Sequence, residues 1–534
     1  MKKIFSVLMI SAVAVTAAAM PARRGPVTRT AEDGTEKTVF LHGDAFSHHM
    51  TDEAGNWLDE TTLRPMSAEQ RAARQQKNAA RRQARRIQQK EQAGSPLNLA
   101  PRGLLIMVNF KNKAFTTPAD TIHEMINGEN FNRSYEYDYT YTYNRKTYTQ
   151  HVVVDHVGGS ARRYFHDVSW GQYNPQFDVV GPYTLSQNYS YYGRNDDANV
   201  GYMIKEACEL ADADGVDFTV YDNNNDGEVD FVYVLYAGYG EADGGPETTV
   251  WPHNYDMQYT GVSCTVDGLE VGNYACSNEI SYYSGMYNGV GTFCHEFSHV
   301  LGLPDLYETN NENSWLGLHT LLEWDILDYG PYNNDGNTPP AYSAYERFFM
   351  GWLKPRVLTD AEYVWLNPLD PGKEALIMCD GDAHNLVGNN PNPATFYLAE
   401  CRTKTGWDEY LPGEGLLITK IKYSNYYWTN NKVNNSANNM GVDLMEAKAN
   451  TSEYAEPTDA FPAGSRQWTA YADHELSQIT LQDGGAVTFS YRGAKPTAIE
   501  TVQPADDAPR KMLRDGQVVI FRNGVLYDLN GRAL

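Results

Sequence analysis

Two histidines and one glutamate stand at a spacing that can bind and use a metal ion. His295, Glu296 and His299 form a His-Glu-x-x-His sequence. On a helix, the two histidines lie four residues apart on one face, where both imidazoles can reach one zinc ion. Glu296 then lies beside the metal, where its carboxylate can act as the general base for a metal-bound water. The pattern predicts hydrolysis by an activated water.

The residues after the second histidine offer a third ligand. Gly302 tolerates the left-handed backbone that ends a helix, and Pro304 stiffens the turn. Asp305 is the oxygen donor available just beyond this turn, so we expect it to complete a three-residue ligand set with water in the fourth position. The alternative is a structural helix with two ordinary histidines, which the full pattern disfavours.

A second group of oxygen donors has the spacing of a calcium-binding loop. Gly227 stands at the sixth position, where such loops turn sharply, but Tyr233 occupies the twelfth position, where an EF-hand has Glu. We therefore expect a shorter loop that enters a strand, with an Asn/Asp-rich turn that binds no metal as the alternative. The candidate calcium ligands are Asp222, Asn224, Asp226, Glu228 and Asp230.

The segments that must position these residues combine strands and helices without regular alternation. Residues 104–110 and 231–237 have the pattern of buried strands, and residues 160–167 and 198–212 have that of helices. From about residue 356 short strands and turns predominate. We predict the α+β class: a zinc peptidase domain over residues 97–355, with a mixed sheet and an active-site helix, then a β-rich domain over residues 356–493.

The N-terminus has the features of a secretory signal peptide. Lys2 and Lys3 precede an apolar run over residues 4–19, and Ala17 and Ala19 form a small-x-small cleavage site. We predict that residues 1–19 are removed before Met20 and that the mature protein is secreted or at the cell surface. A membrane anchor is less favoured because the run is shorter than the ~20 residues of a spanning helix. No later run approaches that length, so we expect no membrane span in the mature chain.

Residues 20–96 are predicted to form a pro-segment that ends in a basic helix. Residues 67–92 are rich in Ala, Gln and Arg and have almost no apolar face. They could be a solvated helical linker, or a basic arm held on an acidic domain, with Arg81–Arg82 and Arg85–Arg86 as processing sites. The formal net charge of -25 leaves the main body acidic, which argues against nucleic-acid binding.

All six cysteines lie between residues 208 and 401. An even number in an exported chain permits three disulfides. Cys379 and Cys401 lie in two strand-like runs, and we predict that they pair. Because no cysteine precedes residue 208, a thiolate of the pro-segment cannot hold the enzyme latent. We expect steric blocking, or an Asp or His of the group His42, Asp44, His48 and His49 that reaches the zinc.

The sequence around the metal site resembles the active-site signature of the immune inhibitor A family of secreted zinc metallopeptidases, relatives of the metzincins. The stretch HEFSHVLGLPDLY carries the resemblance, with further similar blocks at residues 290–294, 323–330 and 342–347. The similarity extends over about residues 100–450, and residues 21–57 resemble that family's pro-region. It implies a metzincin-like fold in which His295, His299 and Asp305 bind zinc and Glu296 is the catalytic base.

Two positions depart from the family pattern. Leu327 stands where the family usually has a Met in the turn beneath the zinc, and this exchange roughly conserves volume, so we expect activity to be retained. The Trp-His pair that often follows the family's Gly-Leu-Leu-Ile strand is missing after Gly415–Ile418. Tyr329 follows the turn beneath the metal and is a candidate electrophile for the oxyanion, with a packing tyrosine as the alternative.

The C-terminal region, residues 494–534, is predicted to be a linker followed by a hairpin. Residues 494–511 are rich in Pro, Ala and Asp, and Asn523–Gly524 separates two strand-like runs. Residues 510–534 resemble the end of a type IX secretion sorting domain. That resemblance implies an outer-membrane secretion machinery as a partner.

The sequence as a whole favours a secreted zinc endopeptidase that is made as a zymogen and cleaves proteins or peptides. Its expected cofactors are zinc and calcium. The alternatives are a binding or adhesion protein built on an inactive peptidase fold, and a peptidase limited to short peptides.

Overall fold

The computed structural model describes residues 18–84, 101–143, 145–309, 320–381 and 385–495, three strands between residues 510 and 527, and residue 532. The segment predicted as a signal peptide therefore lies mostly outside the described residues, as does Arg85–Arg86. Within the described part of the chain, no helix combines the length and apolar character needed to cross a membrane.

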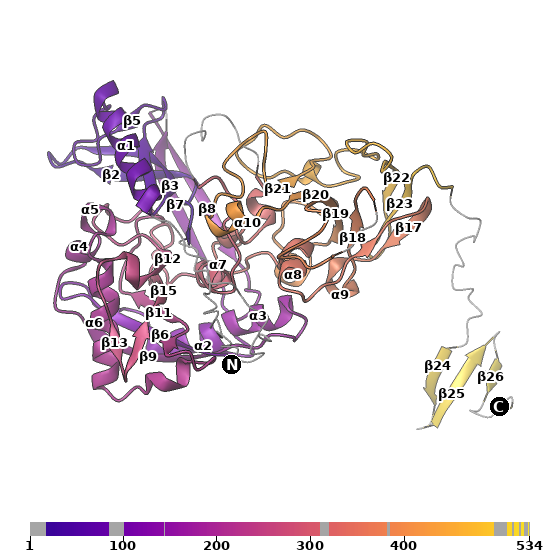
Figure 1. Cartoon of the computed structure of the whole chain (residues 1–534), viewed down its shortest axis with the longest axis horizontal. Helices are drawn as coiled ribbons and strands as arrows, with labels where there is room; N and C mark the ends of the chain where they lie inside the picture. The colour runs from indigo at the N-terminus through magenta and orange to yellow at the C-terminus, as the bar shows by residue number, and fades with distance from the viewer. Residues whose placement is uncertain are drawn as a thin grey trace, which may run out of the picture.

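A six-stranded mixed sheet forms the centre of the molecule (Figure 1). Its order is β1-β12-β15-β11-β6-β9. Four strands run parallel: β15 (Asn273–Asn278), β11 (Val232–Tyr236), β6 (Arg102–Asn109) and β9 (Gln176–Thr184). β12 (His253–Asp256) pairs antiparallel with β15, and β1 (Ala18–Ala19) pairs antiparallel with β12. Both predicted buried strands are thus present at the centre of this sheet.

Helices cover both faces of this sheet, as the alternation of its side chains requires. On one face, Leu105 and Tyr233 pack in a cluster with α2 (Ala119–Asn127), α3 (Ala161–Val168) and α7 (Gly291–Val300). On the other face, Leu104 and Val232 pack with α6 (Val200–Ala213). The helices predicted over residues 160–167 and 198–212 correspond to α3 and α6. The His-Glu-x-x-His sequence therefore lies on a helix buried against the central sheet.

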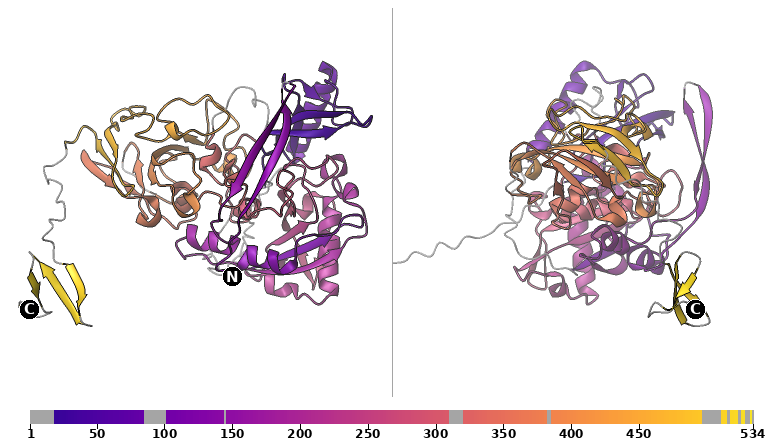
Figure 2. Two further views of the ribbon diagram at one scale, coloured as in Figure 1. Left: turned by 180° about the vertical axis from the view of Figure 1, so that it is seen from behind. Right: turned by 90° about the vertical axis from the view of Figure 1, so that its right-hand side faces the viewer.

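Smaller elements complete this half of the molecule. The short helices α4 (Tyr189–Tyr192) and α5 (Arg194–Asp197) precede α6, and a three-stranded sheet is formed by β10 (Glu228–Val229), β14 (Leu269–Val271) and β13 (Thr265–Val266). β7 (Tyr135–Tyr143) and β8 (Lys146–Val154) form a long hairpin that extends along the side of the molecule toward the N-terminal strands (Figure 2).

The N-terminal region forms its own four-stranded sheet followed by a helix. The strands are β2 (Pro26–Thr30), β3 (Glu36–Asp44), β4 (Ser47–Thr51) and β5 (Trp57–Leu58), and α1 spans Ala68–Ala84. Its buried side chains, among them Val39 and Leu41, share one cluster with Ala242 and Trp251 of the central region. This region therefore completes its small core against the rest of the molecule.

The residues after 356 form two further sheets. A five-stranded sheet contains β16 (Arg356–Val357), β18 (Leu376–Met378), β19 (Thr395–Arg402), β20 (Gly415–Lys422) and β21 (Val442–Leu444). A three-stranded sheet contains β17 (Glu362–Leu366), β23 (Val487–Tyr491) and β22 (Leu476–Leu481). The helices here are α9 (Leu369–Gly372) and α10 (Asn425–Thr429), and α8 (Ala344–Phe349) lies just before this region. β24 (Arg510–Arg514), β25 (Gln517–Arg522) and β26 (Val525–Tyr527) form a C-terminal sheet, which includes the predicted hairpin.

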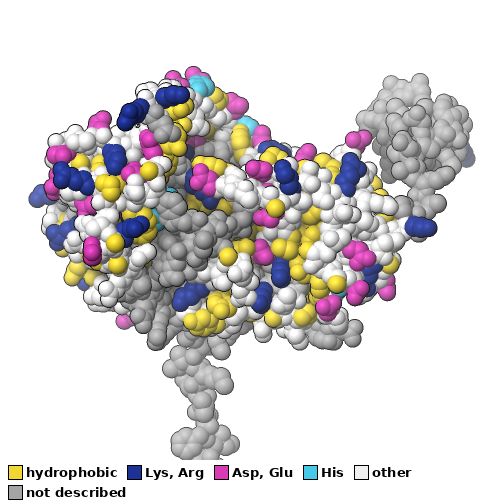
Figure 3. Space-filling model, turned by 90° about the horizontal axis from the view of Figure 1, so that it is seen from above, with side chains coloured by type: hydrophobic (Ala, Val, Ile, Leu, Met, Phe, Trp, Pro, Cys, Tyr) yellow, Lys and Arg dark blue, Asp and Glu magenta, His cyan; other side chains and the backbone are white. Residues whose placement is uncertain are grey.

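The hydrophobic core continues across the position predicted as a domain boundary at residue 356. One cluster contains Tyr345 and Phe348 of α8 together with Phe396 and Leu398 of β19. The five-stranded sheet is thus packed directly against the region that contains α7. On the face shown in Figure 3, basic and acidic side chains are interspersed over the described surface.

The predicted pairing of Cys379 with Cys401 is wrong. All six cysteines have free, buried thiols. β18 and β19 are neighbours as expected, but their antiparallel register pairs Met378 with Tyr397, so Cys401 lies several residues along the strand from the position opposite Cys379. The thiols that do contact each other are those of Cys208 and Cys264.

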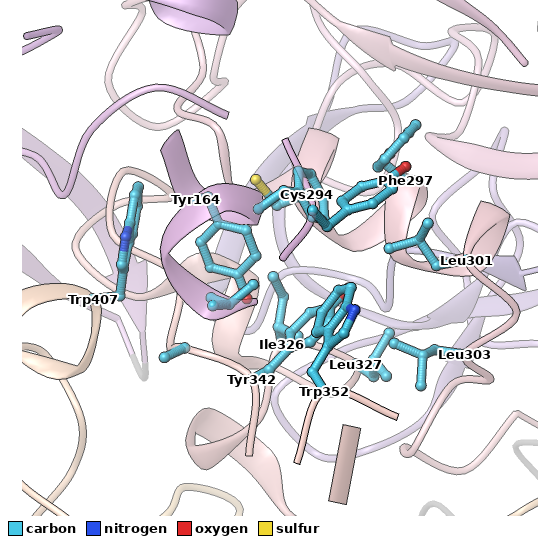
Figure 4. Close-up of a cluster of buried hydrophobic side chains, with 14 of the residues drawn as sticks. Tyr164, Cys294, Phe297, Leu301, Leu303, Ile326, Leu327, Tyr342, Trp352 and Trp407 are labelled. Atoms are coloured by element: carbon cyan, nitrogen blue, oxygen red, sulfur yellow. The ribbon is translucent and has the colours of Figure 1, made fainter. Parts of the chain in front are cut away.

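Leu327, at the position where a Met was expected, is fully buried beneath the active-site helix (Figure 4). It belongs to the same cluster as Phe297, Leu301 and Leu303. Its carbonyl accepts a hydrogen bond from the backbone N–H of Leu306 at 2.8 Å, which ties this turn to the loop that follows the helix. The leucine therefore fills the site as a packing residue.

We predict that Leu327→Ala lowers the free energy of unfolding by about 2–5 kcal/mol, because it leaves a cavity in this core. Leu327→Met should cost less than about 1.5 kcal/mol, because it nearly conserves volume. Urea denaturation of the two variants beside the parent protein measures both effects. Equal destabilisation by Met and Ala would contradict the assignment of Leu327 as a packing residue.

Candidate active site

α7 carries the first two metal-binding candidates on a helix that is held tightly at both ends. At its start, a Cβ at Gly291 would lie 2.0 Å from the carbonyl oxygen of Pro331, so only glycine fits there. Phe293 and Phe297 face the central sheet, where Phe297 contacts Phe231 edge to face. Gly302 has the left-handed backbone that the sequence predicted, with φ of 90°. The chain then turns back toward the helix.

The side chains of His295, His299 and Asp305 converge on one point. The two Nε2 atoms of the histidines lie 3.1 Å apart, and Asp305 Oδ1 lies 3.3 Å from each of them. Ligand bonds of about 2.0–2.2 Å in tetrahedral geometry separate the ligand atoms by about 3.3–3.5 Å. All three side chains are buried. The predicted ligand set therefore has the spacing that a zinc ion requires.

Neighbouring groups fix the orientation of all three ligands. The Nδ1–H groups of His295 and His299 donate to the carbonyls of Ile326 and Leu303, each at 2.7 Å. Because Nδ1 carries the proton, the Nε2 atom of each ring keeps its lone pair, which faces the common point. Asn431 donates its side-chain amide to Asp305 Oδ2 at 2.6 Å and accepts the backbone N–H of Asp305 at 2.7 Å.

The electrostatics favour the protonation states that bind metals. Burial lowers the pKa of His295, so its imidazole is neutral. Burial disfavours the charged form of Asp305, but interaction with His299 and His295 in their protonated forms outweighs this and lowers the pKa of its carboxyl, so a positive charge at this point stabilises the carboxylate. Neutral imidazoles and an ionised carboxylate are the forms that coordinate a divalent cation.

Glu296 lies beside this centre as the sequence predicted. Its carboxylate and the two histidines have ligand atoms within 4.8 Å of one another, and its side chain is buried. Its Oε1 accepts a hydrogen bond from the backbone N–H of Met20 at 3.0 Å. A peptide nitrogen of the chain itself thus lies in contact with the candidate general base.

Residues 18–24, which we call the N-terminal segment, extend through the candidate site. Ala18 and Ala19 pair with Asn254 and His253 on β12. The hydroxyl of Tyr307 donates to the carbonyl of Ala19. In the Ala19–Met20 peptide unit, the carbonyl therefore accepts a hydrogen bond from Tyr307, and the N–H donates a hydrogen bond to Glu296.

The segment continues past this peptide unit along the same region. Trp251 Nε1 donates to the carbonyl of Met20 at 2.9 Å, and the hydroxyl of Tyr332 donates to the carbonyl of Pro21 at 2.7 Å. The backbone N–H of Arg23 donates to the carbonyl of Ala242 at 2.8 Å. These are contacts to backbone atoms, so they do not depend on which side chains the bound peptide carries.

Tyr329, the electrophile suggested by the sequence, has a different environment from Tyr307. The guanidinium of Arg24 lies 3.5 Å from the centre of the Tyr329 ring, and Arg24 also pairs with Glu323 at 3.1 Å. Burial raises the pKa of Tyr329, and Arg24 partly offsets this. The sequence analysis did not single out Tyr307, although it stands only two residues after Asp305.

The side chains proposed as latency ligands lie around the N-terminal sheet. His48 stacks on Trp251 and has its Nε2 3.5 Å from Glu241 and 3.6 Å from Asp196. His42 hydrogen-bonds Thr51, and Asp44 accepts the backbone N–H groups of Phe46 and Ser47. His49 stacks on Trp57. The residue that reaches Glu296 is Met20, which the sequence analysis placed at the start of the mature chain and did not propose as a latency residue.

The predicted calcium donors lie close together before β11, on a tight loop and on the short strand β10, which contains Glu228. The carboxylate of Asp222 accepts the backbone N–H groups of Asp226 and Gly227, each at 3.1 Å. The amide of Asn224 donates to Asp226 and to Asp230, also at 3.1 Å. Burial, together with Asp226 and Asp222, raises the pKa of Asp230. The backbone N–H of Glu228 donates to Asp226 at 3.0 Å.

Comparison with known proteins supports the metal centre. Residues 99–353 match the catalytic domain of the immune inhibitor A peptidase M6 family. The pre-pro-metalloprotease PrtV of Vibrio cholerae serotype O1 is 27% identical over 219 residues, which are 36% of this chain and 23% of PrtV. Immune inhibitor A of Bacillus thuringiensis subsp. alesti is 22% identical over 228 residues, which are 35% of this chain and 31% of that protein. The match thus spans less than a third of either relative.

We predict that Asn431→Ala weakens metal binding by about 10- to 100-fold, because Asp305 loses the group that orients it. Titration with a competing chelator, followed by measurement of bound metal, tests this. The neighbouring variant Asn430→Ala is the matched control, since the Asn430 amide donates to the carbonyl of Tyr426. Equal metal retention in the two variants would show that Asn431 does not orient the ligand.

Proposed function

We propose, from the premise that residues 99–353 are a metallopeptidase domain of the immune inhibitor A type, that this chain is a secreted zinc endopeptidase made as a zymogen. The observation that carries the proposal is the Ala19–Met20 peptide unit, whose N–H contacts Glu296 beside the buried histidines. A site that holds a peptide bond against its general base is suited to peptide hydrolysis.

His295, His299 and Asp305 would hold the zinc ion. When bound, zinc supplies a water of lowered pKa and polarises the carbonyl of the scissile bond. Glu296 accepts the proton of the attacking water. It then delivers this proton to the leaving amine, and its contact of 3.0 Å with the Met20 nitrogen places it within reach of that atom.

Tyr307 is the group that we propose to stabilise the oxyanion. Its hydroxyl donates to the carbonyl of Ala19, on the peptide unit whose nitrogen contacts Glu296. A donor at this oxygen is worth most when negative charge develops there during attack. Tyr307 therefore replaces Tyr329 as the electrophile in this proposal.

Strand β12, which becomes the edge of the central sheet when β1 leaves, is proposed to bind the substrate backbone. β1 adds to β12 as a short antiparallel strand, which is the way an extended peptide adds to a sheet edge. Recognition through backbone hydrogen bonds accepts many sequences. This supports protein or peptide substrates of varied sequence.

In this proposal the zymogen is inactive because the N-terminal segment occupies the site where a substrate would bind. The rest of the pro-segment, predicted as residues 20–96, anchors it. On α1, Lys77 pairs with Asp196 at 2.5 Å, and Arg74 lies 3.5 Å from the same carboxylate. These pairs link the basic helix to α5 and favour the interpretation as a basic arm on an acidic domain over that as a free linker.

Export is proposed from the predicted signal peptide over residues 1–19. Because Ala18 and Ala19 contact β12 and Tyr307 in the zymogen, this proposal moves the cleavage from before Met20 to before Ala18. The C-terminal residues 510–534, which resemble part of a type IX sorting domain, are the candidate contact with an outer-membrane secretion machinery. Calcium bound by Asp222, Asn224, Asp226, Glu228 and Asp230 is proposed to stabilise the loop that enters β11.

Removing the pro-segment by cleavage between residues 84 and 101 should raise casein hydrolysis strongly over that of the intact chain, because the N-terminal segment leaves the site. A zinc chelator and the variant Glu296→Ala should each abolish the gain. A folded, zinc-loaded and processed protein that leaves both casein and short peptides intact would favour a binding or adhesion role, and cleavage of short peptides alone would favour the narrower peptidase.

Tyr307→Phe should lower kcat by about 10²–10³-fold with little change in KM, because it removes a donor to the oxyanion and keeps the ring. Steady-state hydrolysis by the processed protein measures both constants. Tyr329→Phe is the matched control, and its kcat should stay within a few-fold of the parent. A larger loss in Tyr329→Phe would restore Tyr329 as the electrophile.

Calcium should raise the thermal midpoint of the parent protein. A ligand at a hundred times its Kd stabilises the folded state by about 2.7 kcal/mol. Asp226→Asn should lose this response, whereas Asp212→Asn, on the exposed end of α6, should keep it. Scanning calorimetry of each variant with and without added calcium chloride measures this shift of the thermal midpoint. An unchanged shift in Asp226→Asn would show that calcium binds at other residues.

A further inference from the structure

The side chain of Arg23 is held between acidic and aromatic residues outside the metal centre. Its guanidinium pairs with Asp243 at 3.2 Å and with Asp335 at 2.5 Å. The carbon at its centre lies 4.3 Å from the centre of the Tyr283 ring and 5.7 Å from that of Tyr332. We call the residues Asp243, Asp335, Tyr283 and Tyr332 the arginine site. All four lie in the part of the chain that matches a peptidase domain.

Other residues of this region hold both carboxylates in position. Asp243 Oδ2 accepts the backbone N–H of Tyr282 at 2.8 Å. Asp335 accepts the hydroxyls of Tyr135 and Tyr137, on the hairpin strand β7, at 2.8 and 3.1 Å. The arginine site is therefore built independently of Arg23, and it would persist after the pro-segment has left.

The burial of these carboxylates favours a cation between them. With the pro-segment in place, the side chain of Asp243 is 8% exposed and that of Asp335 is 2% exposed. Burial raises the pKa of Asp243, and Arg23 partly offsets this. Without Arg23, two closely placed carboxylates would face each other with no cation, which is unfavourable in a partly buried site.

An arginine fits this site better than a lysine. A planar guanidinium can donate to two carboxylates at once and stack on an aromatic ring. Arg23 makes all these contacts, and its Nη1 also lies 3.4 Å from Ser281 Oγ. The ammonium of a lysine is a compact charge, so it would pair with the carboxylates but would not reproduce the stacking on Tyr283.

The number of residues between the Ala19–Met20 bond and Arg23 defines where the arginine site lies relative to the metal centre. If the Ala19–Met20 unit occupies the position of the bond to be cleaved, Met20 is the first residue of the leaving segment and Arg23 is the fourth. The backbone of Arg23 is itself fixed by the hydrogen bond to Ala242. A substrate that follows the same path places its own fourth residue at Asp243 and Asp335.

We propose that in the processed enzyme the arginine site is a substrate subsite, which binds an arginine side chain four residues to the carboxyl side of the cleaved bond. The proposal rests on the endopeptidase function above and adds a substrate preference to it. The competing interpretation is that the site serves only to anchor the pro-segment.

The test is a digestion of a proteome-derived peptide library by the processed protein, with mass spectrometry of the cleavage products. We expect arginine to be enriched at the fourth residue of the leaving segment. The enrichment should disappear in Asp243→Asn and persist in Asp120→Asn, whose carboxyl group lies at the exposed start of α2. A parent protein that cleaves the library with no preference at this position overturns the proposal.

A second measurement leaves the arginine site unaltered. The best-cleaved library peptide is synthesised with arginine or with citrulline, its uncharged isostere, at the fourth position. We expect kcat/KM to fall by at least about tenfold with citrulline, mainly through KM, because a buried charge pair is lost. Equal constants would show that the site is only an anchor for the pro-segment.

The failure of this proposal differs from the failure of the proposed function. If casein and the library both remain intact, the endopeptidase function fails. In that case, binding to the processed Glu296→Ala variant is measured with the synthetic peptide Met20–Pro26 that carries arginine or citrulline at position 23. Tighter binding of the arginine form still supports an arginine-selective site, and equal binding rejects it.

Discussion

The proposed metal centre depends on one constraint: three buried ligand atoms must stay within about 3.3 Å of one another. His295 Nε2, His299 Nε2 and Asp305 Oδ1 meet this condition. A helix alone supplies the first two, since residues four apart share a face. The third depends on a turn that starts at Gly302 and is held from outside the helix. Leu327 holds this turn through its carbonyl, and Asn431 holds it through its side-chain amide. The packing of the two halves of the molecule is thus part of the metal site.

In the proposed function, the same peptide unit connects this centre to substrate binding and to latency. Glu296 contacts the nitrogen of Met20, Tyr307 contacts the carbonyl of Ala19, and β12 pairs with the residues just before. Each group contacts a part of a peptide that every substrate also has. An N-terminal segment bound through such contacts competes with substrates directly, and the additional contacts of Arg23 and Arg24 strengthen its position. A single binding mode therefore explains how the chain could be both a peptidase and its own inhibitor.

The sequence predicted the features that depend on local spacing. It identified α7, the buried strands β6 and β11, and the residues His295, Glu296, His299 and Asp305, because a helical repeat and a glycine turn place them together. It did not identify Asn431, which lies 126 residues from Asp305, because nothing in a sequence indicates which distant amide meets a loop. The pairing of Cys379 with Cys401 failed because neighbouring strands were inferred correctly but their register was not. The role of Tyr307 became visible only once the N-terminal segment was seen beside it.

The most direct test of the central claim is the location of the metal in a crystal of the intact chain, by anomalous diffraction at the zinc edge. The account predicts a strong peak at about 2.0–2.2 Å from His295 Nε2, His299 Nε2 and Asp305 Oδ1, with the Ala19–Met20 region of the chain beside it. A peak at other residues, or a zinc-loaded protein with none at these three atoms, would contradict it.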